Sequence, residues 1–173
     1  MKYRQLTKEQ FESLHEEFSR FLATQSIDVN EWNTIKKSKP QVAEEEMNIF
    51  SDIVWDDVLT RTNYVEHFSK NTANLFKCDE KEIHRIVIKV DSHINLLEQE
   101  GFEWLMKNPM DESLEIFKGT KKYNSDRNLE IFDLIEKKQF PKGSKILAIH
   151  TGGLQGIQGM NDKLKKKNLP IIK

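Results

Sequence analysis

The chain has a single cysteine among its 173 residues, and this scarcity excludes two kinds of stabilisation. One thiol cannot form an intrachain disulfide framework or supply a zinc site with several cysteine ligands. Cys78 is therefore expected to be a small buried residue in a protein of the reducing cytoplasm. No apolar run approaches the ~20 residues that span a bilayer, and the amino terminus lacks the apolar stretch of a secretion signal. These absences predict a cytoplasmic protein with no membrane partner.

Glycine is also scarce, because the first 136 residues contain only Gly101 and Gly119. They hold no glycine-rich phosphate loop and no Gly-x-Ser-x-Gly turn around a nucleophilic serine. The five histidines lack His-Glu-x-x-His spacing and any pairing with Cys78, so no metal site is predicted. Two groups of adjacent carboxylates, Asp56-Asp57 and Glu44-Glu45-Glu46, are predicted to lie on solvated helix faces. We expect no catalytic residue and no cofactor in this part of the chain.

Charge divides the chain into two parts. Residues 137–173 carry nine lysines against one acid, Asp162, which gives a net charge of +8. Of the chain's 27 basic and 28 acidic side chains, 18 and 27 then belong to residues 1–136, whose net charge is −9. An acidic domain repels phosphate, so nucleic-acid binding is disfavoured except weakly through the basic tail. The predicted organisation is an acidic domain, residues 1–136, followed by a basic tail, residues 137–173.

Helix signals dominate the first 60 residues. Thr7 opens a capping box at the start of a helix predicted over residues 8–25. Asp28 caps a short second helix, which must end before Pro40 because the proline ring clashes with a preceding helical turn. A third helix is predicted from Pro40 onward, with an apolar stripe along one side.

Aromatic side chains are concentrated on these helices. Core packing is the favoured interpretation, because the aromatics lie on the stripes that bring the helices together. A groove for a partner helix is the alternative, since exposed aromatic clusters mark interaction sites. The residues concerned are Phe11, Phe18, Phe21, Trp32, Phe50 and Trp55.

The spacing of the apolar residues changes near residue 64 from a helical pattern to one typical of strands. Three segments have strand length and β-rich composition, and polar turns separate them: residues 64–69, 74–78 and 83–90. In the third, Ile86 and Ile88 share one face, whereas Arg85 and Lys89 point to the other. This alternation predicts an antiparallel meander with one wet side.

The remaining elements of the acidic part complete the fold class. A helix is predicted over residues 97–107, a fourth strand over residues 113–118, and a last helix capped by Ser125. Three helices followed by strands with interspersed helices predict an α+β fold.

Residues 1–136 resemble a small bacterial family of uncharacterised proteins. The resemblance implies one small domain and brings no activity with it. It is carried by Met1-Lys-Tyr-Arg-Gln-Leu-Thr-Lys-Glu, Asn48-Ile-Phe-Ser-Asp-Ile-Val-Trp-Asp, Tyr64-Val-Glu-His-Phe, Tyr123-Asn-Ser-Asp-Arg and Ile131-Phe-Asp-Leu-Ile-Glu.

Residues 132–173 look like a different protein. Lys145-Ile-Leu-Ala-Ile-His-Thr-Gly-Gly and the following Gly156-Ile-Gln-Gly resemble the carboxyl terminus of the 1-aminocyclopropane-1-carboxylate deaminase and D-cysteine desulfhydrase family. That family depends on pyridoxal phosphate. The resemblance implies that Thr151 would lie near the ring nitrogen of the cofactor, and that Gly152 and Gly153 would permit close backbone approach.

The chain departs from that enzyme family in its first 136 residues. They lack the family's Schiff-base lysine motif and its phosphate-binding turns, so a strand and turn without a cofactor is the favoured interpretation of the tail. We therefore predict a non-enzymatic domain that binds another protein. The alternative is a fragment or fusion of a pyridoxal-phosphate deaminase, inactive as it stands. A join near residues 131–137 is predicted. The strand Ile146 to Ile149 must add to an edge of the domain's sheet, pack against another copy of the chain or remain frayed, and addition to the sheet is the favoured interpretation.

Overall fold

The computed structural model describes residues 1–136 and the backbone of residues 145–150. The chain divides between Thr60 and Arg61 into two compact units. We call residues 1–60 the helical unit, and residues 61–136 with the strand at 145–150 the sheet unit. The α+β class predicted from the sequence is confirmed. Within the described residues no helix has the length and apolar character needed to cross a bilayer.

The helical unit contains four helices where the sequence predicted three. Its first helix is interrupted at Leu14, whose backbone angles of φ −109° and ψ 25° are not helical. The prediction of one helix over residues 8–25 is therefore wrong, although the capping box at Thr7 and the cap at Asp28 are confirmed. The helices are α1 (Lys8–Ser13), α2 (His15–Thr24), α3 (Val29–Ser38) and α4 (Pro40–Arg61).

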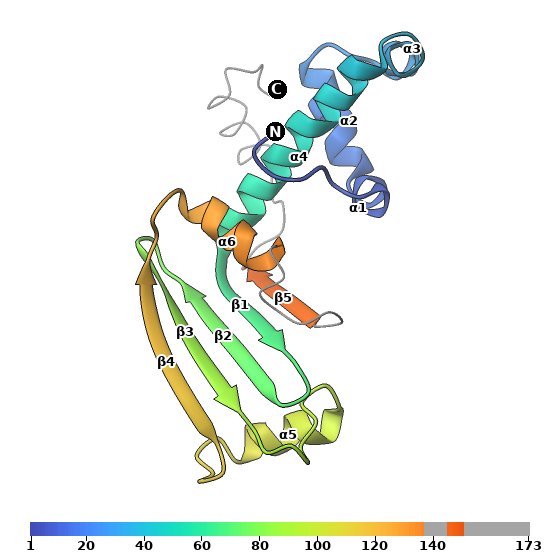
Figure 1. The fold of residues 1–173 in the computed structure, drawn as a ribbon. Helices are drawn as coiled ribbons and strands as arrows, with labels where there is room; N and C mark the ends of the chain where they lie inside the picture. The colour runs from blue at the N-terminus through green and yellow to red at the C-terminus, as the bar shows by residue number, and fades with distance from the viewer. Residues whose placement is uncertain (137–144, 151–173) are drawn as a thin grey trace. The chain divides into compact units, whose positions relative to one another are not determined.

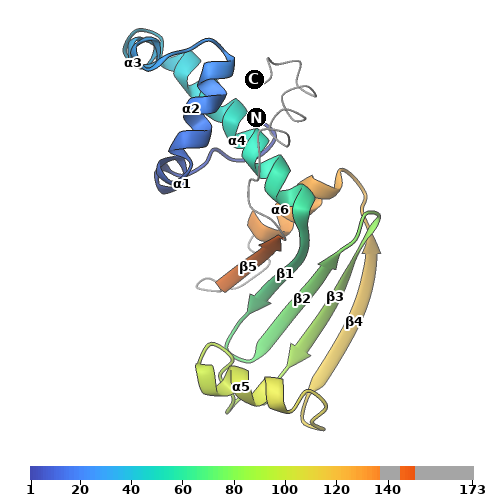
Figure 2. The ribbon, with the colours of Figure 1, turned by 180° about the vertical axis from the view of Figure 1, so that it is seen from behind.

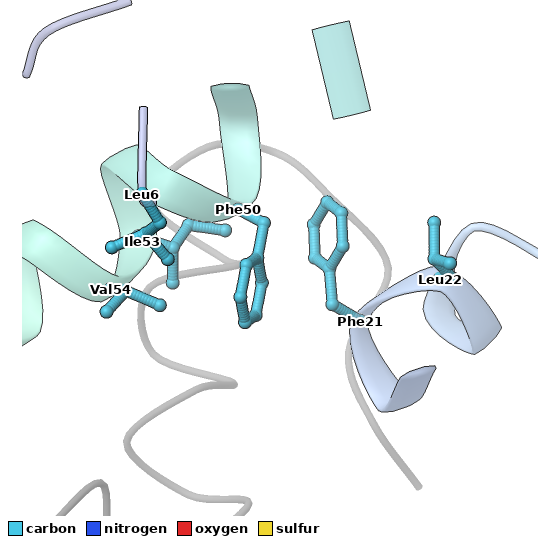
Figure 3. Packing of buried hydrophobic residues seen from close by; sticks show 6 residues of the cluster. All are labelled: Leu6, Phe21, Leu22, Phe50, Ile53 and Val54. Atoms are coloured by element: carbon cyan, nitrogen blue, oxygen red, sulfur yellow. The ribbon is translucent and has the colours of Figure 1, made fainter. Parts of the chain in front are cut away.

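The core of the helical unit is built from aromatic and aliphatic side chains (Figure 3). Phe21 and Phe50 are both fully buried, and their ring centroids lie 5.5 Å apart at an angle of 46°. Phe18 makes an edge-on contact with Trp32 at 5.4 Å, which ties α3 to the same cluster. Aromatic pairs at these separations stabilise a core beyond their buried area. The interpretation of the helical aromatics as core residues is confirmed.

The first seven residues, which we call the N-terminal strap, are held on α4 by polar side chains. The Asp52 carboxylate accepts hydrogen bonds from the backbone N–H groups of Lys2, at 2.9 and 2.7 Å, and Tyr3, at 2.9 Å. The Ser51 hydroxyl accepts one from the N–H of Leu6 at 3.1 Å. These bonds satisfy backbone donors that an irregular segment would otherwise leave unpaired. Two of the segments that carry the resemblance to the uncharacterised family, residues 1–9 and 48–56, are thus bound to each other.

The carboxylates of α4 differ from their prediction. Glu44 and Glu45 are exposed, as expected, whereas Glu46 of the same group is half-buried, and burial raises the pKa of its carboxyl. Asp57 is buried, and Asp56 accepts bonds from the Tyr3 hydroxyl at 2.5 Å and the Lys2 ammonium at 3.0 Å. The prediction of a solvated face for Asp56-Asp57 is wrong, because the strap binds Asp56 and Asp57 is buried.

The sheet unit is built on a five-stranded sheet of order β4-β3-β2-β1-β5, in which all neighbours are antiparallel (Figures 1 and 2). The strands predicted near residues 64, 74 and 83 form its three inner members. Helices α5 (Gln99–Lys107) and α6 (Arg127–Glu136) lie at opposite ends of the sheet. The strands are β1 (Thr62–Phe68), β2 (Thr72–Cys78), β3 (Glu82–Lys89), β4 (Glu115–Lys122) and β5 (Lys145–His150).

Two details of this unit bear on the sequence predictions. The predicted tail strand is present as β5, and its backbone pairs with β1 at one edge of the sheet, as expected.

The last helix is capped by Asp126, whose carboxylate accepts from the N–H of Leu129 at 3.0 Å, so the predicted cap at Ser125 is wrong. Ser125 instead donates its N–H to Glu130 at 2.9 Å. The division of the chain at residue 136 stays a prediction.

Candidate binding surfaces of the sheet unit

Strand register defines two faces of the sheet. On the face that packs on α5, Ala73 lies opposite Ile88, and both belong to a buried cluster with Leu105 of α5. On the other face, which we call the α6 face, a row of residues crosses four strands in register: Val65, Phe76, Arg85 and Gly119. Alternate residues of a strand point to opposite faces, so these two sets are separate surfaces.

The α5 face carries an open apolar hollow of about 580 Å³. Met110 is 88% exposed and Ile116 is 43% exposed, although both side chains are apolar. Such side chains are costly to leave in water when they lie together, and a grouped apolar patch marks an interaction site. The apolar hollow is lined by Leu75, Ile86, Ile88, Pro109, Met110, Ile116 and Lys118.

Strand β4 borders this hollow and forms one edge of the sheet. Every residue of β4 is exposed, and Phe117, on the face opposite Ile116, is 50% exposed. An edge strand presents N–H and C=O groups that can pair with another strand. Its side chains include Lys118, Lys121 and Lys122, against one acid, Glu115.

The α6 face carries a second concave site, which we call the Arg85 groove, of about 450 Å³. Part of its lining is apolar, formed by Phe76, Ile83 and Leu134, which we call its apolar floor, and other lining residues carry charges of both signs. The Lys121 ammonium lies 2.9 Å from the Glu130 carboxylate. The groove is lined by Phe76, Ile83, Arg85, Gly119, Thr120, Lys121, Tyr123, Glu130, Asp133 and Leu134.

Arg127 acts as a clamp at the end of the sheet nearest α6. Its guanidinium donates to the backbone carbonyls of Thr62 at 2.6 Å, Cys78 at 2.9 Å and Asp79 at 3.0 Å. The first of these lies at the start of β1, and the other two lie at the end of β2. One cation therefore satisfies carbonyls from two strands, which is a structural role and explains the Tyr123-to-Arg127 segment of the family resemblance.

Cys78 lies beside this clamp and is buried, as the sequence predicted. Burial raises the pKa of the Cys78 thiol to about 11, and the Arg127 guanidinium offsets only part of that effect. The Tyr123 hydroxyl beside it is also buried, which raises its pKa to about 12. Neither group is ionised near neutral pH, so the pair does not form an activated nucleophile.

We expect Cys78 to resist alkylation. Iodoacetamide at pH 8 should modify it at least about 100-fold more slowly than it modifies the chain in urea, because only about 0.1% of the folded thiol is ionised at that pH. The unfolded chain also loses this proton first, so the thiol contributes a loss of stability as the pH rises from about 9 to 11. Equal alkylation rates in the two states, measured by mass spectrometry, would contradict the burial.

His67 is the one fully buried histidine of the described residues. Its Nδ1 lies 3.4 Å from the Asn74 amide nitrogen, and the Asn74 oxygen accepts from Arg85 at 2.6 Å. Burial and the Arg85 charge lower the pKa of His67, so it is neutral near pH 7. The other described histidines make surface contacts, for example His93 with Asp91 at 2.8 Å. Residues 1–136 contain no group of three or more His, Cys, Asp or Glu placed to hold a metal ion.

The cofactor residues implied by the deaminase resemblance, Thr151, Gly152 and Gly153, lie outside the described residues. Sequence reasoning missed both concave sites of the sheet unit. The available signals were Gly119, a glycine inside a strand-forming segment, and the apolar Ile116 next to Lys118, Lys121 and Lys122.

Comparison with known proteins agrees with one of the two resemblances. A family model described as a family of unknown function, DUF6495, matches residues 1–147, which reach past Glu136 into β5. No curated protein and no solved structure matches the chain. Nothing in these comparisons supports the deaminase resemblance of residues 132–173. The strap, the α4 carboxylates and the Arg127 clamp all lie within the matched range, and the chain belongs to the DUF6495 family of unknown function.

Proposed function

We propose that the protein is a binding module that takes an extended segment of another protein onto strand β4 of the sheet unit. The single observation that carries this proposal is the fully exposed edge strand beside the apolar hollow. A module with one buried thiol suits the reducing cytoplasm, where we place it.

The backbone of β4 supplies the first part of the binding energy. Because β4 is the last strand on its side of the sheet, a partner strand can add to it by main-chain hydrogen bonds. Such pairing fixes the partner as an extended segment and places its alternate side chains on the two faces of the sheet.

Side chains of the hollow supply the second part. A partner strand beside β4 would place every second residue next to Ile116 and Lys118, which line the hollow with Met110. Apolar side chains of the partner would therefore cover the exposed area of these residues. Methionine suits such a surface, since its flexible side chain adapts to different partners.

The charged residues of β4 further restrict the composition of the partner segment. The edge strand carries Lys118, Lys121 and Lys122 against one acid, Glu115; Lys121 lies 2.9 Å from Glu130 and Glu115 lies 3.4 Å from Lys89, so the strand keeps a net positive charge. Acidic residues that alternate with the partner's apolar ones would lie on the α6 face beside Lys121, and like charges disfavour a lysine-rich partner. The partner class is an extended segment that alternates apolar and acidic side chains.

The test uses a fluorescent peptide that alternates valine and glutamate, and a second peptide with lysine in place of glutamate. We expect the first to bind the full chain and the second not to bind. Ile116→Thr should weaken binding about tenfold, because it removes an apolar contact from the hollow yet keeps a β-branched residue in the strand. Val29→Thr, the same kind of change at an exposed position of α3, should leave binding unchanged.

Two outcomes would overturn the proposal. One is equal loss of binding in the Ile116 and Val29 variants. The other is a dimer that Ile116→Thr dissociates, because the occupant of the edge would then be a second copy of the chain. The alternative function, an inactive relative of a pyridoxal-phosphate deaminase, rests only on the resemblance of residues 132–173.

A further inference from the structure

The two glycines of the first 136 residues have different surroundings. A Cβ at Gly101 would collide with the backbone carbonyl of Asn95, so packing explains that glycine. A Cβ at Gly119 would meet no other heavy atom within 4 Å. Glycine inside a strand weakens it and often marks a place where a ligand approaches the backbone closely. Gly119 lies opposite Arg85 in the register of β3 and β4, and both residues line the Arg85 groove.

Arg85 is held in position for binding. Its guanidinium donates to the Asn74 oxygen at 2.6 Å and lies over the Phe76 ring, 5.4 Å from its centroid. Asn74 takes one of the five N–H donors that a guanidinium carries. The planar, anchored cation is suited to bind a carboxylate with two parallel hydrogen bonds.

The rest of the groove restricts the ligand. Phe76, Ile83 and Leu134 form an apolar floor, and the volume of about 450 Å³ lies in the range of small-molecule sites. Glu130 and Asp133 on the α6 wall oppose multiply charged anions such as phosphate esters. A single negative charge on an apolar body meets both conditions.

We propose that the Arg85 groove binds a small monocarboxylate with an apolar body, in which the carboxylate pairs with Arg85 and the body covers Gly119 and the apolar floor. The apolar hollow proposed for the partner strand is on the α5 face, whereas this groove is on the α6 face; the two sites share strand β4, whose Gly119, Thr120 and Lys121 line the groove.

The probes are 3-phenylpropionate, its neutral amide and inorganic phosphate, each titrated into the full ¹⁵N-labelled chain. We expect 3-phenylpropionate to bind with a dissociation constant of about 1 mM and to shift the amide signals of Gly119 and Thr120. The amide and phosphate should bind at least about tenfold more weakly, because the first lacks the charge and the second has no apolar body.

Two variants should abolish this binding for different reasons. Arg85→Gln removes the cation, whereas Gly119→Val fills the open space with a side chain that favours strands and has room to fit. Lys107→Gln removes an equal charge from an exposed position of α5, 3.3 Å from Glu103, and binding should stay within about twofold of the unchanged chain.

The remaining outcomes overturn the proposal. If the amide and the carboxylate bound equally, the groove would recognise only the apolar body of the ligand. If phosphate bound as well as 3-phenylpropionate, the groove would attract anions in general. Undiminished binding in Arg85→Gln or Gly119→Val would place the ligand elsewhere. The valine-glutamate peptide should bind the Arg85→Gln variant normally. Suppose instead that Arg85→Gln no longer bound the peptide and that 3-phenylpropionate did not bind the unchanged chain. The groove would then be part of the binding site for the partner strand.

Discussion

Replacing Arg127 with methionine is expected to lower the free energy of unfolding of the sheet unit by about 3–5 kcal/mol. The guanidinium donates to three backbone carbonyls, those of Thr62, Cys78 and Asp79. Hydrogen bonds from a charged donor contribute about 1.5–3 kcal/mol each, and they are not additive when one group makes all of them. Methionine keeps much of the side-chain length but leaves the carbonyls without this donor.

Two further variants test that explanation. Arg127→Lys keeps the positive charge but not the planar guanidinium with its several N–H donors. About half of the loss in the free energy of unfolding should therefore remain. Arg20→Met removes an exposed arginine 3.5 Å from Glu16 and should change stability by less than about 0.5 kcal/mol. Urea unfolding followed by circular dichroism gives these values. If Arg127→Met and Arg20→Met had equal effects, the clamp would be only a surface contact.

Replacing Asp52 with alanine is expected to destabilise the helical unit by about 2–4 kcal/mol. The carboxylate accepts from two successive backbone N–H groups of the strap, those of Lys2 and Tyr3, and it is buried at 7% exposure. Alanine would leave these donors unpaired and loosen the strap, which Ser51 and Asp56 would still hold. The strap contributes Leu6 to the core, so its loosening would also expose apolar area.

The matched variants separate the carboxylate from its neighbours. Asp52→Asn keeps one acceptor oxygen and should cost about half as much as alanine. Glu12→Ala removes an exposed acid 3.8 Å from Lys8 and should cost less than about 0.5 kcal/mol. Unfolding monitored through amide exchange of α4 is the measurement. An Asp52→Ala variant as stable as Glu12→Ala would mean that the strap is not bound through this carboxylate.

The parts of the fold that were predictable depend on local chemistry. Thr7 and Asp28 cap helices through bonds to residues three positions away, and Pro40 limits the preceding helix by its own ring. The strand alternation around Arg85 is local too. Leu14 was missed because its side chain keeps the helical spacing of apolar residues across the interruption, and it still packs on the same core.

Features that depend on distant partners were not predictable. Asp56 was predicted to lie on a solvated helix face, and Asp52 gave no signal, because the strap that binds both lies about 50 residues earlier in the chain. The exposure of Ile116 and Met110 was not predictable, because one sequence does not show which face of a sheet a helix covers. The Arg85 groove requires the register of β3 and β4 and the position of α6, which are tertiary facts.

Amide hydrogen exchange of the full chain, with and without the valine-glutamate peptide, tests the central claim most directly. An added strand would pair with the outer N–H groups of β4, and the account predicts at least about tenfold slower exchange within residues 115–122, with the helical unit unchanged. Protection confined to residues 1–60, or none in β4 at saturating peptide, would contradict the assignment of β4 as the binding edge.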